Sequence, residues 1–409
     1  MAWESWEVSG FASFGGGRLS LYDHKYIDFK EGDWGFNSDS VVGLQANKQL
    51  TNRWGFTAQT VANGYAFNDE EPYTPELEWM LLSYDLNSKV QIRGGRLRNP
   101  FYFYSTTQEV GYTYLWVRPP TSVYNLFFNP FKHFDGADIT FHSSAGMFDV
   151  DYTFFAGTTS GEYEGIDIEV TEAFGGRLSA SSLDTRFYLT LEHIKGDASP
   201  PDNFDALKEG FEGFAEFFAS DPATSNAFLV AADSFDSEDQ ITNSLSTGVE
   251  WNSGNLNLIS EIFLVRGENR NYSYDSDGYY ASAGYRLNKI TPYLVYGFFE
   301  NRFSKDTQNK IDATEDFVPS GAINLLGVQG AATLDALRDG TRFAIDQYNS
   351  KQATTTLGFR YDFHSKADFK VEIEHFQLLT NGGTFSTENL DRTRPKNAYL
   401  ISFVIDVVF

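Results

Sequence analysis

The sequence predicts an all-β fold, a transmembrane antiparallel β-barrel of about sixteen strands that forms a single domain over residues 1–409. Three observations lead to this prediction. Segments of about 10 to 13 residues, long enough to cross a bilayer as tilted strands, alternate apolar and polar side chains along the whole chain. The connections between these segments alternate between short and long. Aromatic residues make up 17% of the chain, with 38 Phe and 23 Tyr, far more than a surface in water requires.

The composition excludes several other classes of protein. The 56 acidic and 31 basic residues give a formal net charge of -25, so nothing would neutralise phosphates and no nucleic-acid partner is expected. Cysteine is absent, which excludes a disulfide scaffold and thiolate metal sites. No apolar run reaches the ~18 to 20 residues of a transmembrane helix. The opening residues MAWESWEVSG lack the basic segment and apolar core of a secretory signal, and we therefore expect a mature chain.

Sixteen segments show the period of two residues that is typical of half-buried strands. They are 5–16, 40–50, 55–67, 77–86, 90–101, 136–145, 147–158, 170–180, 185–196, 241–251, 256–267, 278–288, 291–303, 352–363, 369–379 and 397–409. At one end, the spacers between them are turn-sized and rich in Asn, Ser, Gly and Asp. These spacers are TNRW, NSK, a single Gly146, SLD, NSGN, KI and HSKAD.

The spacers at the other end include the long segments 18–39, 102–135, 197–240 and 304–351. A transmembrane barrel has short periplasmic turns on one rim, long extracellular loops on the other, and an even number of strands. Both termini then lie on the side of the short turns. Sixteen strands with seven turns and eight loops satisfy these conditions, whereas a soluble sandwich has no reason to place every long connection at one end.

Two of the long loops are expected to carry short helices. In 197–240, the Pro-Pro-Asp stretch at 200–202 indicates the start of an amphipathic helix, whose apolar face we expect to pack on the barrel mouth. The apolar positions at helical spacing are Leu207, Phe211, Phe214 and Phe218. In 304–351, the segment AATLDALRD (331–339) predicts a second helix that ends at Gly340.

The last segment, YLISFVIDVVF, predicts a strand with one lipid face and one face toward the lumen. The residues of the predicted lipid face are Tyr399, Ile401, Phe403, Ile405, Val407 and Phe409. Tyr399 and Phe409 then lie at the two interfaces, where transmembrane barrels carry aromatic girdles. Ser402 and Asp406 have the opposite parity and face the lumen.

The final Phe409 resembles the terminal aromatic of bacterial outer-membrane proteins, which the barrel-assembly machinery reads as a signal. Beyond this residue, the whole chain resembles the sixteen-stranded trimeric porins of Gram-negative outer membranes, in a marine gammaproteobacterial variety. The resemblance is most evident in VQIRGGRLRNPFYFYSTTQEVGYTYLWVRPP, where a strand with Gly and Arg leads into a long loop. It implies a homotrimer in the bacterial outer membrane, in contact with lipid and lipopolysaccharide. It also implies a passive, water-filled channel narrowed by residues 102–135, which fold into the lumen.

The strand 90–101 carries the strongest candidates for a functional site, Arg93, Arg96 and Arg98. Gly94-Gly95 predicts a bulge that shifts the register so that all three arginines point inward. An arginine on the lipid face near the middle of the membrane costs roughly 2–4 kcal/mol, which favours this arrangement. The alternative is a structural role, in which the arginines bind carbonyl groups of the loop.

The resemblance implies a constriction in which carboxylates of the inserted loop oppose basic residues of the wall, and the field between them selects solutes. The loop residues assigned to it are Glu109, Tyr112, Tyr114, Trp116 and Arg118. Glu109 is the only acid of this loop before Asp135, so the acidic side is thin. We therefore expect weak anion preference or none, although the net charge alone would predict strong cation preference.

The acidic fifth loop is a weak candidate for divalent cations. From 198 to 240 there are ten Asp or Glu and one Lys. Ca2+ prefers such oxygen ligands and could bridge them to lipopolysaccharide phosphates, but we favour a solvated acidic rim. The residues considered are Asp202, Asp205, Glu209 and Glu212. No other metal or cofactor is expected.

Other functions fit the sequence less well. The six histidines are scattered, and the chain has no His-Glu-x-x-His, Gly-x-Ser-x-Gly or phosphate-loop motif, so no enzyme is expected. A channel specific for saccharides or small carboxylates is an alternative, because the loop aromatics could form a stacking track and the arginines a carboxylate site. A second alternative is an adhesin or phage-receptor barrel closed by its loops.

Overall fold

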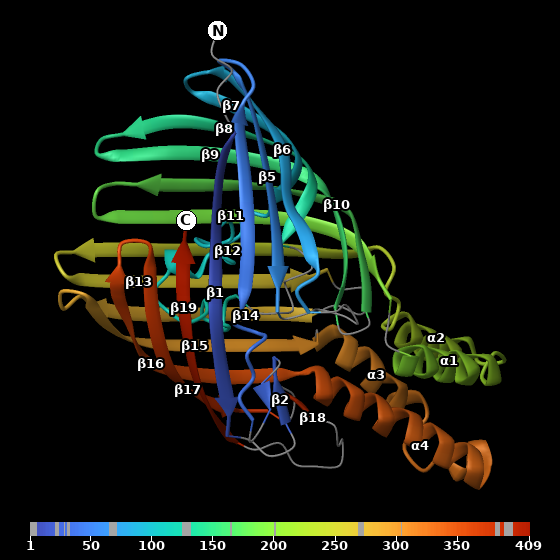
Figure 1. The fold of residues 1–409 in the computed structure, drawn as a ribbon. Coiled ribbons are helices and arrows are strands. Elements are labelled where there is room, and N and C mark those ends of the chain that lie inside the picture. Colours follow the sequence, from blue (N-terminus) through green and yellow to red (C-terminus); the bar gives the residue numbers. More distant parts are fainter. Residues whose placement is uncertain are drawn as a thin grey trace.

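The computed structural model describes residues 6–20, 24–27, 29–30, 33–64, 72–124, 132–163, 166–199, 202–268, 274–303, 305–380, 385–387 and 396–409. Sixteen of the described strands close an antiparallel barrel, in which β1 (Glu7–Leu19) pairs with β19 (Asn397–Val408). Figure 1 shows this barrel, with the helices gathered beyond one of its ends. The predicted fold class is confirmed.

Every barrel strand pairs with its neighbours in sequence order. The remaining barrel strands are β4 (Val41–Gln49), β5 (Trp54–Asn63), β6 (Pro75–Asn87), β7 (Val90–Arg98), β8 (His133–Ala145), β9 (Phe148–Tyr163), β10 (Ile166–Ser181), β11 (Thr185–Ala198), β12 (Gln240–Ser253), β13 (Leu256–Gly267), β14 (Tyr274–Tyr285), β15 (Ile290–Phe303), β16 (Ser350–His364) and β17 (Ala367–Leu378). Their positions match the sixteen predicted segments. The match arises because one face of a barrel wall contacts lipid and the other the lumen, so apolar and polar side chains alternate along each strand.

Short connections join the strands at one end of the barrel and long ones at the other, as predicted. The short connections are 50–53, 88–89, 146–147, 182–184, 254–255, 286–289 and 365–366. The hairpin of β9 and β10 differs from the prediction, since its strands extend until Tyr163 pairs with Ile166. Most residues between the predicted strands 147–158 and 170–180 therefore belong to β9 and β10.

The last strand has the two faces that its sequence predicts. Tyr399, Ile401, Ile405 and Val407 are exposed on the outer face, whereas Ser402 and Asp406 are buried on the inner face. The backbone of Phe409 pairs with Gly10 of β1 through two hydrogen bonds of 2.9 Å, so the terminal residue completes the closure of the barrel. Its ring lies over Gly10, where an added Cβ would come within 2.5 Å of the ring.

A small sheet closes part of the barrel mouth from the inside. It consists of β2 (His24–Tyr26) and β3 (Phe29–Lys30), which lie between β1 and β4, and of β18 (Phe385–Thr387), which lies between β17 and β19. An apolar cluster holds this sheet to the inner wall of the barrel. The buried members of the cluster are Leu19, Tyr26, Phe29, Phe376, Leu378, Ala398 and Leu400.

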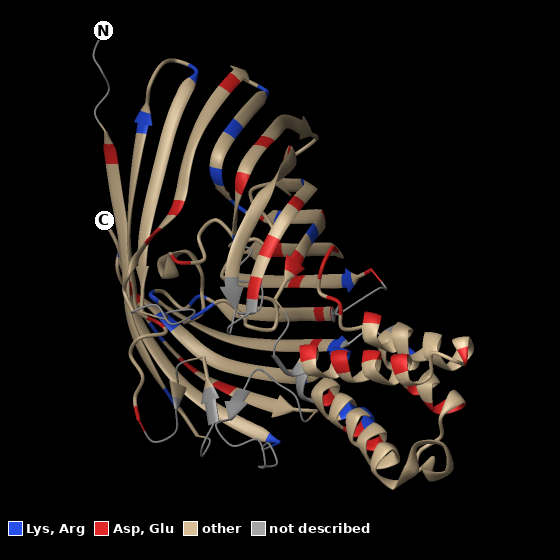
Figure 2. Cartoon of the chain, turned by 90° about the vertical axis from the view of Figure 1, so that its right-hand side faces the viewer, with Lys and Arg blue, Asp and Glu red and all other residues tan. Residues whose placement is uncertain are grey.

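The described residues contain four α-helices, all in the long loops predicted at 197–240 and 304–351. They are α1 (Asp202–Phe217), α2 (Pro222–Asp233), α3 (Lys305–Phe317) and α4 (Ile323–Tyr348). The helix predicted to start at 200–202 is confirmed as α1. Its apolar face packs on the other helices, around Phe211, Phe228 and Ile311, and not on the barrel mouth. Gly340 does not end α4; the helix is interrupted only at Gly327, which has φ 72°. Figure 2 shows acidic positions along these helices, outside the barrel.

None of the described helices is both long enough and apolar enough to span a membrane.

Candidate functional site

The third long connection, which the resemblance places in the lumen, binds inward side chains of the barrel wall through its residues 99–124. Its backbone accepts hydrogen bonds from inward side chains of three strands: Arg177 of β10, Ser246 of β12 and Lys370 of β17. Its short 3-10 helix η1 (Gly111–Thr113) lies beside β17, where Lys370 Nζ donates to the Gly111 carbonyl at 2.6 Å. The connection thus crosses the lumen, and residues 125–131 within it lie outside the described part of the chain.

One buried carboxylate, Glu261 of β13, holds the loop to the wall. Its two oxygens accept four hydrogen bonds, from the hydroxyls of Tyr124 and Tyr280 at 2.6 Å, from Tyr188 at 2.7 Å and from the Phe103 backbone N–H at 2.9 Å. Burial raises the pKa of the Tyr124 hydroxyl, and the charge of Glu261 raises it further, so Tyr124 remains a donor. Hydrogen bonds to an ionised acceptor are among the strongest in proteins.

Arg118 is the second anchor of the loop, and its wall partners lie on β17 and β19. Its guanidinium pairs with Asp39 of the first long loop at 2.7 Å and with Glu374 and Glu372 of β17. It also donates to Ser402 Oγ of β19 at 2.8 Å. Burial alone would lower the pKa of Arg118, but the neighbouring carboxylates outweigh this and raise it, so the side chain stays charged.

The predicted bulge at Gly94-Gly95 is wrong. The pairing of β7 with β6 and with β8 continues through both glycines without a shift, and Gly95 instead adopts φ +130°. Because side chains alternate between faces, Arg93 and Arg96 lie on opposite faces of the wall. Arg93 points inward beside the buried Asp138. Arg96 lies opposite the exposed Met80 of β6 in the strand register, and it therefore points outward, contrary to the prediction.

All three predicted arginines are engaged in ion pairs. Arg93 is bound by Asp138, and Arg96 by Asp135 at 2.8 Å. Arg98 is buried where β6 and β7 separate, and it pairs there with Glu78 at 3.3 Å and with Glu109 of the loop. The expected anion preference rested on positive charge without opposing carboxylates, and these residues carry no such excess.

Several aromatic residues of the loop are packed in the interior of the barrel. Trp116 is 1% exposed, donates from Nε1 to Ser282 Oγ at 3.0 Å and meets Tyr280 edge-on. Tyr114 is buried and donates to the Gln108 carbonyl, and Tyr112 donates to the Ser365 carbonyl at the end with short turns. Trp116 therefore offers no ring face to a solute, whereas Tyr114 and Tyr124 line a cavity beside the loop, so the alternative of a stacking track for saccharides stays a prediction.

An open space remains beside the loop, which we call the side passage. It is a cavity of about 150 Å³ between the loop and the wall of β1, β4, β5 and β6. Its charged lining residues are the carboxylates Asp39, Glu76, Glu78 and Glu109 and the cations Arg118 and Lys132. Both of these cations come from the inserted loop, whereas Glu76 and Glu78 belong to β6. Glu109 of the loop, bound to Arg98 of β7, fits the predicted constriction, in which the loop supplies acids and the wall supplies bases, whereas Lys132 of the loop, bound to Glu76 and Glu78, has the opposite arrangement.

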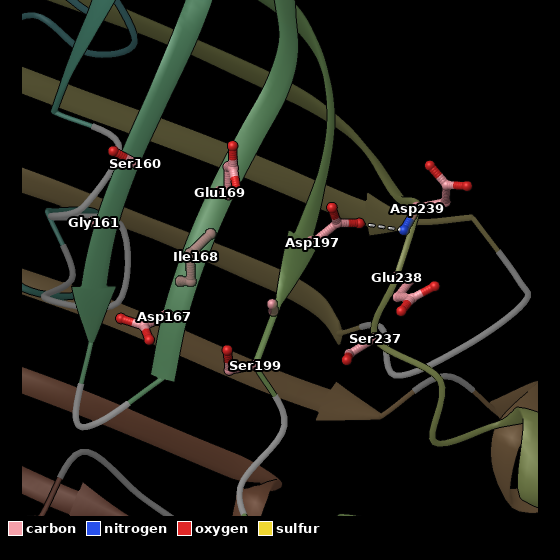
Figure 3. A pocket seen from close by; sticks show the side chains of 11 residues that line it. Ser160, Gly161, Asp167, Ile168, Glu169, Asp197, Ser199, Ser237, Glu238 and Asp239 are labelled. Atoms are coloured by element: carbon pink, nitrogen blue, oxygen red, sulfur yellow. Dashed lines mark hydrogen bonds between the residues drawn. The ribbon is translucent and has the colours of Figure 1, made fainter.

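A second, wider pocket lies at the end with long loops, between β9, β10, β11 and the start of β12. It measures about 1020 Å³ and is strongly acidic (Figure 3). Its acidic lining residues are Asp167, Glu169, Asp197, Glu238 and Asp239. Lys195 pairs with Asp239 at 2.8 Å, and the Asp239 backbone N–H donates to Asp197 at 2.7 Å. The pocket is open to solvent and lies at the rim of the barrel.

The acidic residues of α1 are not gathered into a metal site. Asp205, Glu209 and Glu212 are exposed along the helix, and the side chain of Asp202 lies outside the described part. Among the described residues, no three His, Asp or Glu side chains converge to hold a metal ion. Calcium at this loop therefore stays a prediction, without a cluster of described ligands to support it.

Comparison with solved structures finds barrels of the same fold. An anion-selective porin from Comamonas acidovorans is 12% identical, with 99% of both chains covered and a TM-score of 0.55. The outer membrane channel DcaP of Acinetobacter baumannii is 10% identical over 99% of this chain and 97% of that one, with a TM-score of 0.55. The trimer form of OmpT, an outer membrane protein of Vibrio cholerae, is 10% identical over 99% of both chains, with a TM-score of 0.50.

No family model and no curated protein sequence matches the chain. At identities of 10–12%, the likeness to the solved structures shows a common fold.

Proposed function

We propose that the protein is a porin of the bacterial outer membrane, a passive diffusion channel for small hydrophilic solutes and ions. The observation that carries this proposal is a sixteen-stranded barrel whose inserted loop leaves the side passage open beside it. An apolar outer face and an ion-paired inner face suit a barrel with lipid outside and water inside. The short turns then face the periplasm, and α1 to α4 stand on the cell surface.

Transport through such a channel needs no moving part. Solutes diffuse through water past the inserted loop, and the space between the loop and the β4–β6 wall limits their size. Glu261 and Arg118 fasten the loop at two distant points, which keeps this space constant. The polar lining exchanges hydrogen bonds with a solute in place of water, so a hydrophilic solute passes more easily than an apolar one.

The proposal includes a homotrimer in contact with lipid and lipopolysaccharide. Exposed apolar side chains on β1 and β4, among them Phe14, Val42 and Leu44, provide a surface that other subunits or lipid must cover. The trimer form of OmpT lends support by its fold. Phe409, exposed at the end of the closing strand, is in the position where the barrel-assembly machinery would read it.

Conductance tests the proposal. Purified protein in a planar lipid bilayer should give stable single-channel steps in potassium chloride, and it should admit small sugars into liposomes. A folded barrel that conducts no ions would contradict the proposal and favour the alternative of an adhesin or receptor barrel closed by its loops. The buried Trp116 offers no ring face to a saccharide, and no described feature favours an enzyme.

A further inference from the structure

The side passage carries more acid than base on its surface. Glu78 is bound by Lys132 at 2.5 Å, and Asp39 is bound by Arg118, so both lining cations already have carboxylate partners. Glu76 remains 52% exposed and lies 3.5 Å from Lys132, which it shares with Glu78. A solute in the passage therefore meets carboxylate oxygens that its lining cations do not fully neutralise.

The residues behind this lining do not reverse the imbalance. Arg98 adds one buried cation, which is bound by Glu78 and Glu109. Glu372 and Glu374 lie behind Arg118 and pair with it. Without these two buried groups, the four carboxylates Asp39, Glu76, Glu78 and Glu109 still outnumber the three cations Arg98, Arg118 and Lys132.

The inner faces of β4 and β5 supply no described cation that would reverse this sign. The inward side chains in the middle of β4 and β5 are neutral amides and hydroxyls, and Asn63 at the end of β5 lines the passage. Gln59 Nε2 donates to Gln45 Oε1 at 3.0 Å, and Thr57 donates to Asn47 at 2.9 Å. Amides offer donors and acceptors to a polar solute, but they carry no charge.

We propose that the side passage makes the channel selective for cations, with small solutes that carry an ammonium group and hydroxyls as its preferred class, and that Glu76 is a residue that determines this selectivity. The inference rests on the proposed function, since it concerns the same channel. It is opposite to the weak anion preference that the arginines of β7 suggest when the sequence is considered alone.

The expected effect is moderate. Unit charges about 4 Å apart in water shift an equilibrium about fivefold, and the Debye length of about 10 Å at 0.1 M salt confines the effect to residues in the passage. We expect potassium to permeate at least about fivefold better than chloride. Ethanolammonium should likewise permeate better than glycolate, an anion of similar size that also carries one hydroxyl.

The experiment measures reversal potentials of single channels under gradients of potassium chloride, ethanolammonium chloride and sodium glycolate. Glu76→Gln should lower the cation-to-anion permeability ratio about two- to fivefold, and Glu76→Lys should lower it further. Gln108→Glu adds a carboxylate to the lining of the same passage and should raise the ratio. Glu238→Gln removes the same charge from the rim pocket and should leave the ratio unchanged.

The outcomes separate this inference from the proposed function. A wild-type channel that conducts but prefers chloride, or a ratio that Glu76→Gln and Gln108→Glu do not move, would overturn the cation selectivity and leave the channel function intact. An equal shift in Glu238→Gln would assign the selectivity to the rim and overturn the role of Glu76. Wild-type barrels that never conduct would overturn the proposed function itself.

Discussion

Removing the Glu261 carboxylate should release the inserted loop from the wall without opening the barrel. Glu261 is 0% exposed and accepts hydrogen bonds from three tyrosine hydroxyls and one backbone N–H. Only two of these donors, Tyr124 and Phe103, belong to the loop. Tyr188 and Tyr280 belong to β11 and β14, and they hold the carboxylate in position.

The magnitude follows from these four bonds. A hydrogen bond to a charged group contributes about 1.5–3 kcal/mol, against about 0.5–1.5 kcal/mol for a neutral one. Glu261→Gln keeps one acceptor oxygen and replaces the other by an NH2 donor, so two of the four donors lose their acceptor. It should lower the free energy of unfolding by about 2–4 kcal/mol, because the reduced cost of burying an amide offsets part of the loss. Glu261→Ala leaves the donors without an acceptor, at about 1–3 kcal/mol each where water does not replace it, and should cost more. Tyr280→Phe removes a single bond to the charged group and should cost about 1.5 kcal/mol.

The assay combines two readouts, the free energy of unfolding in denaturant and the current noise of the open channel. The loss of stability should grow from Tyr280→Phe through Glu261→Gln to Glu261→Ala, and the noise should rise in the two Glu261 variants because the loop moves in the lumen. Glu238→Gln is the matched control for loss of an acidic side chain. Quiet channels of unchanged size in Glu261→Ala would refute the role of this residue as an anchor.

Three further substitutions test other parts of the structure. Gly95→Ala should fold poorly, because its φ is +130° and an added Cβ would lie 2.2 Å from the Met80 carbonyl, whereas Gly94→Ala, with nothing nearer than 3.9 Å, should fold normally; equal yields of refolded barrel would contradict this. Deletion of Phe409 should lower the amount of protein assembled in the outer membrane more than the stability of the folded barrel, and an undiminished amount in membrane fractions would argue against an assembly signal. Arg118→Met leaves three buried carboxylates unpaired and should cost about 3–5 kcal/mol and enlarge the channel; a channel of wild-type conductance and stability would count against this.

The strands could be predicted from the sequence because each strand has one face toward lipid and one toward the lumen. Apolar and polar side chains therefore alternate along it, and the alternation shows which side chain lies on which face. The same rule predicts the inner and outer faces of β19. It fails at Gly94-Gly95, where two glycines suggest an inserted residue. Only Gly95 takes a positive φ, and it does so without breaking the pairing. A bulge and a flipped glycine have the same sequence signature, and only the pairing distinguishes them.

Some features were missed although a local signal was present. Helix α2 begins at Asp221-Pro222, where the Asp221 carboxylate accepts from the Ala223 backbone N–H at 3.3 Å and Pro222 fills the first turn. Both are recognised signals for a helix start. The partners of Glu261 had no such signal, because Tyr124 lies 137 positions away in the sequence and its contact depends on the path of the loop.

The excess of acid in the side passage has a physical cause in how the loop is held. The loop has a single carboxylate before β8, Glu109, and this residue is already bound to Arg98. The loop cations Arg118 and Lys132 are buried or nearly so, and a buried cation is tolerated only beside carboxylates. Those carboxylates have to come from outside the loop, from Asp39, Glu78 and Glu374. These carboxylates already pair with the loop cations. A further acid at the opening, such as Glu76, therefore adds negative charge that no cation fully neutralises, and the negative field in the side passage results from the way the loop is anchored.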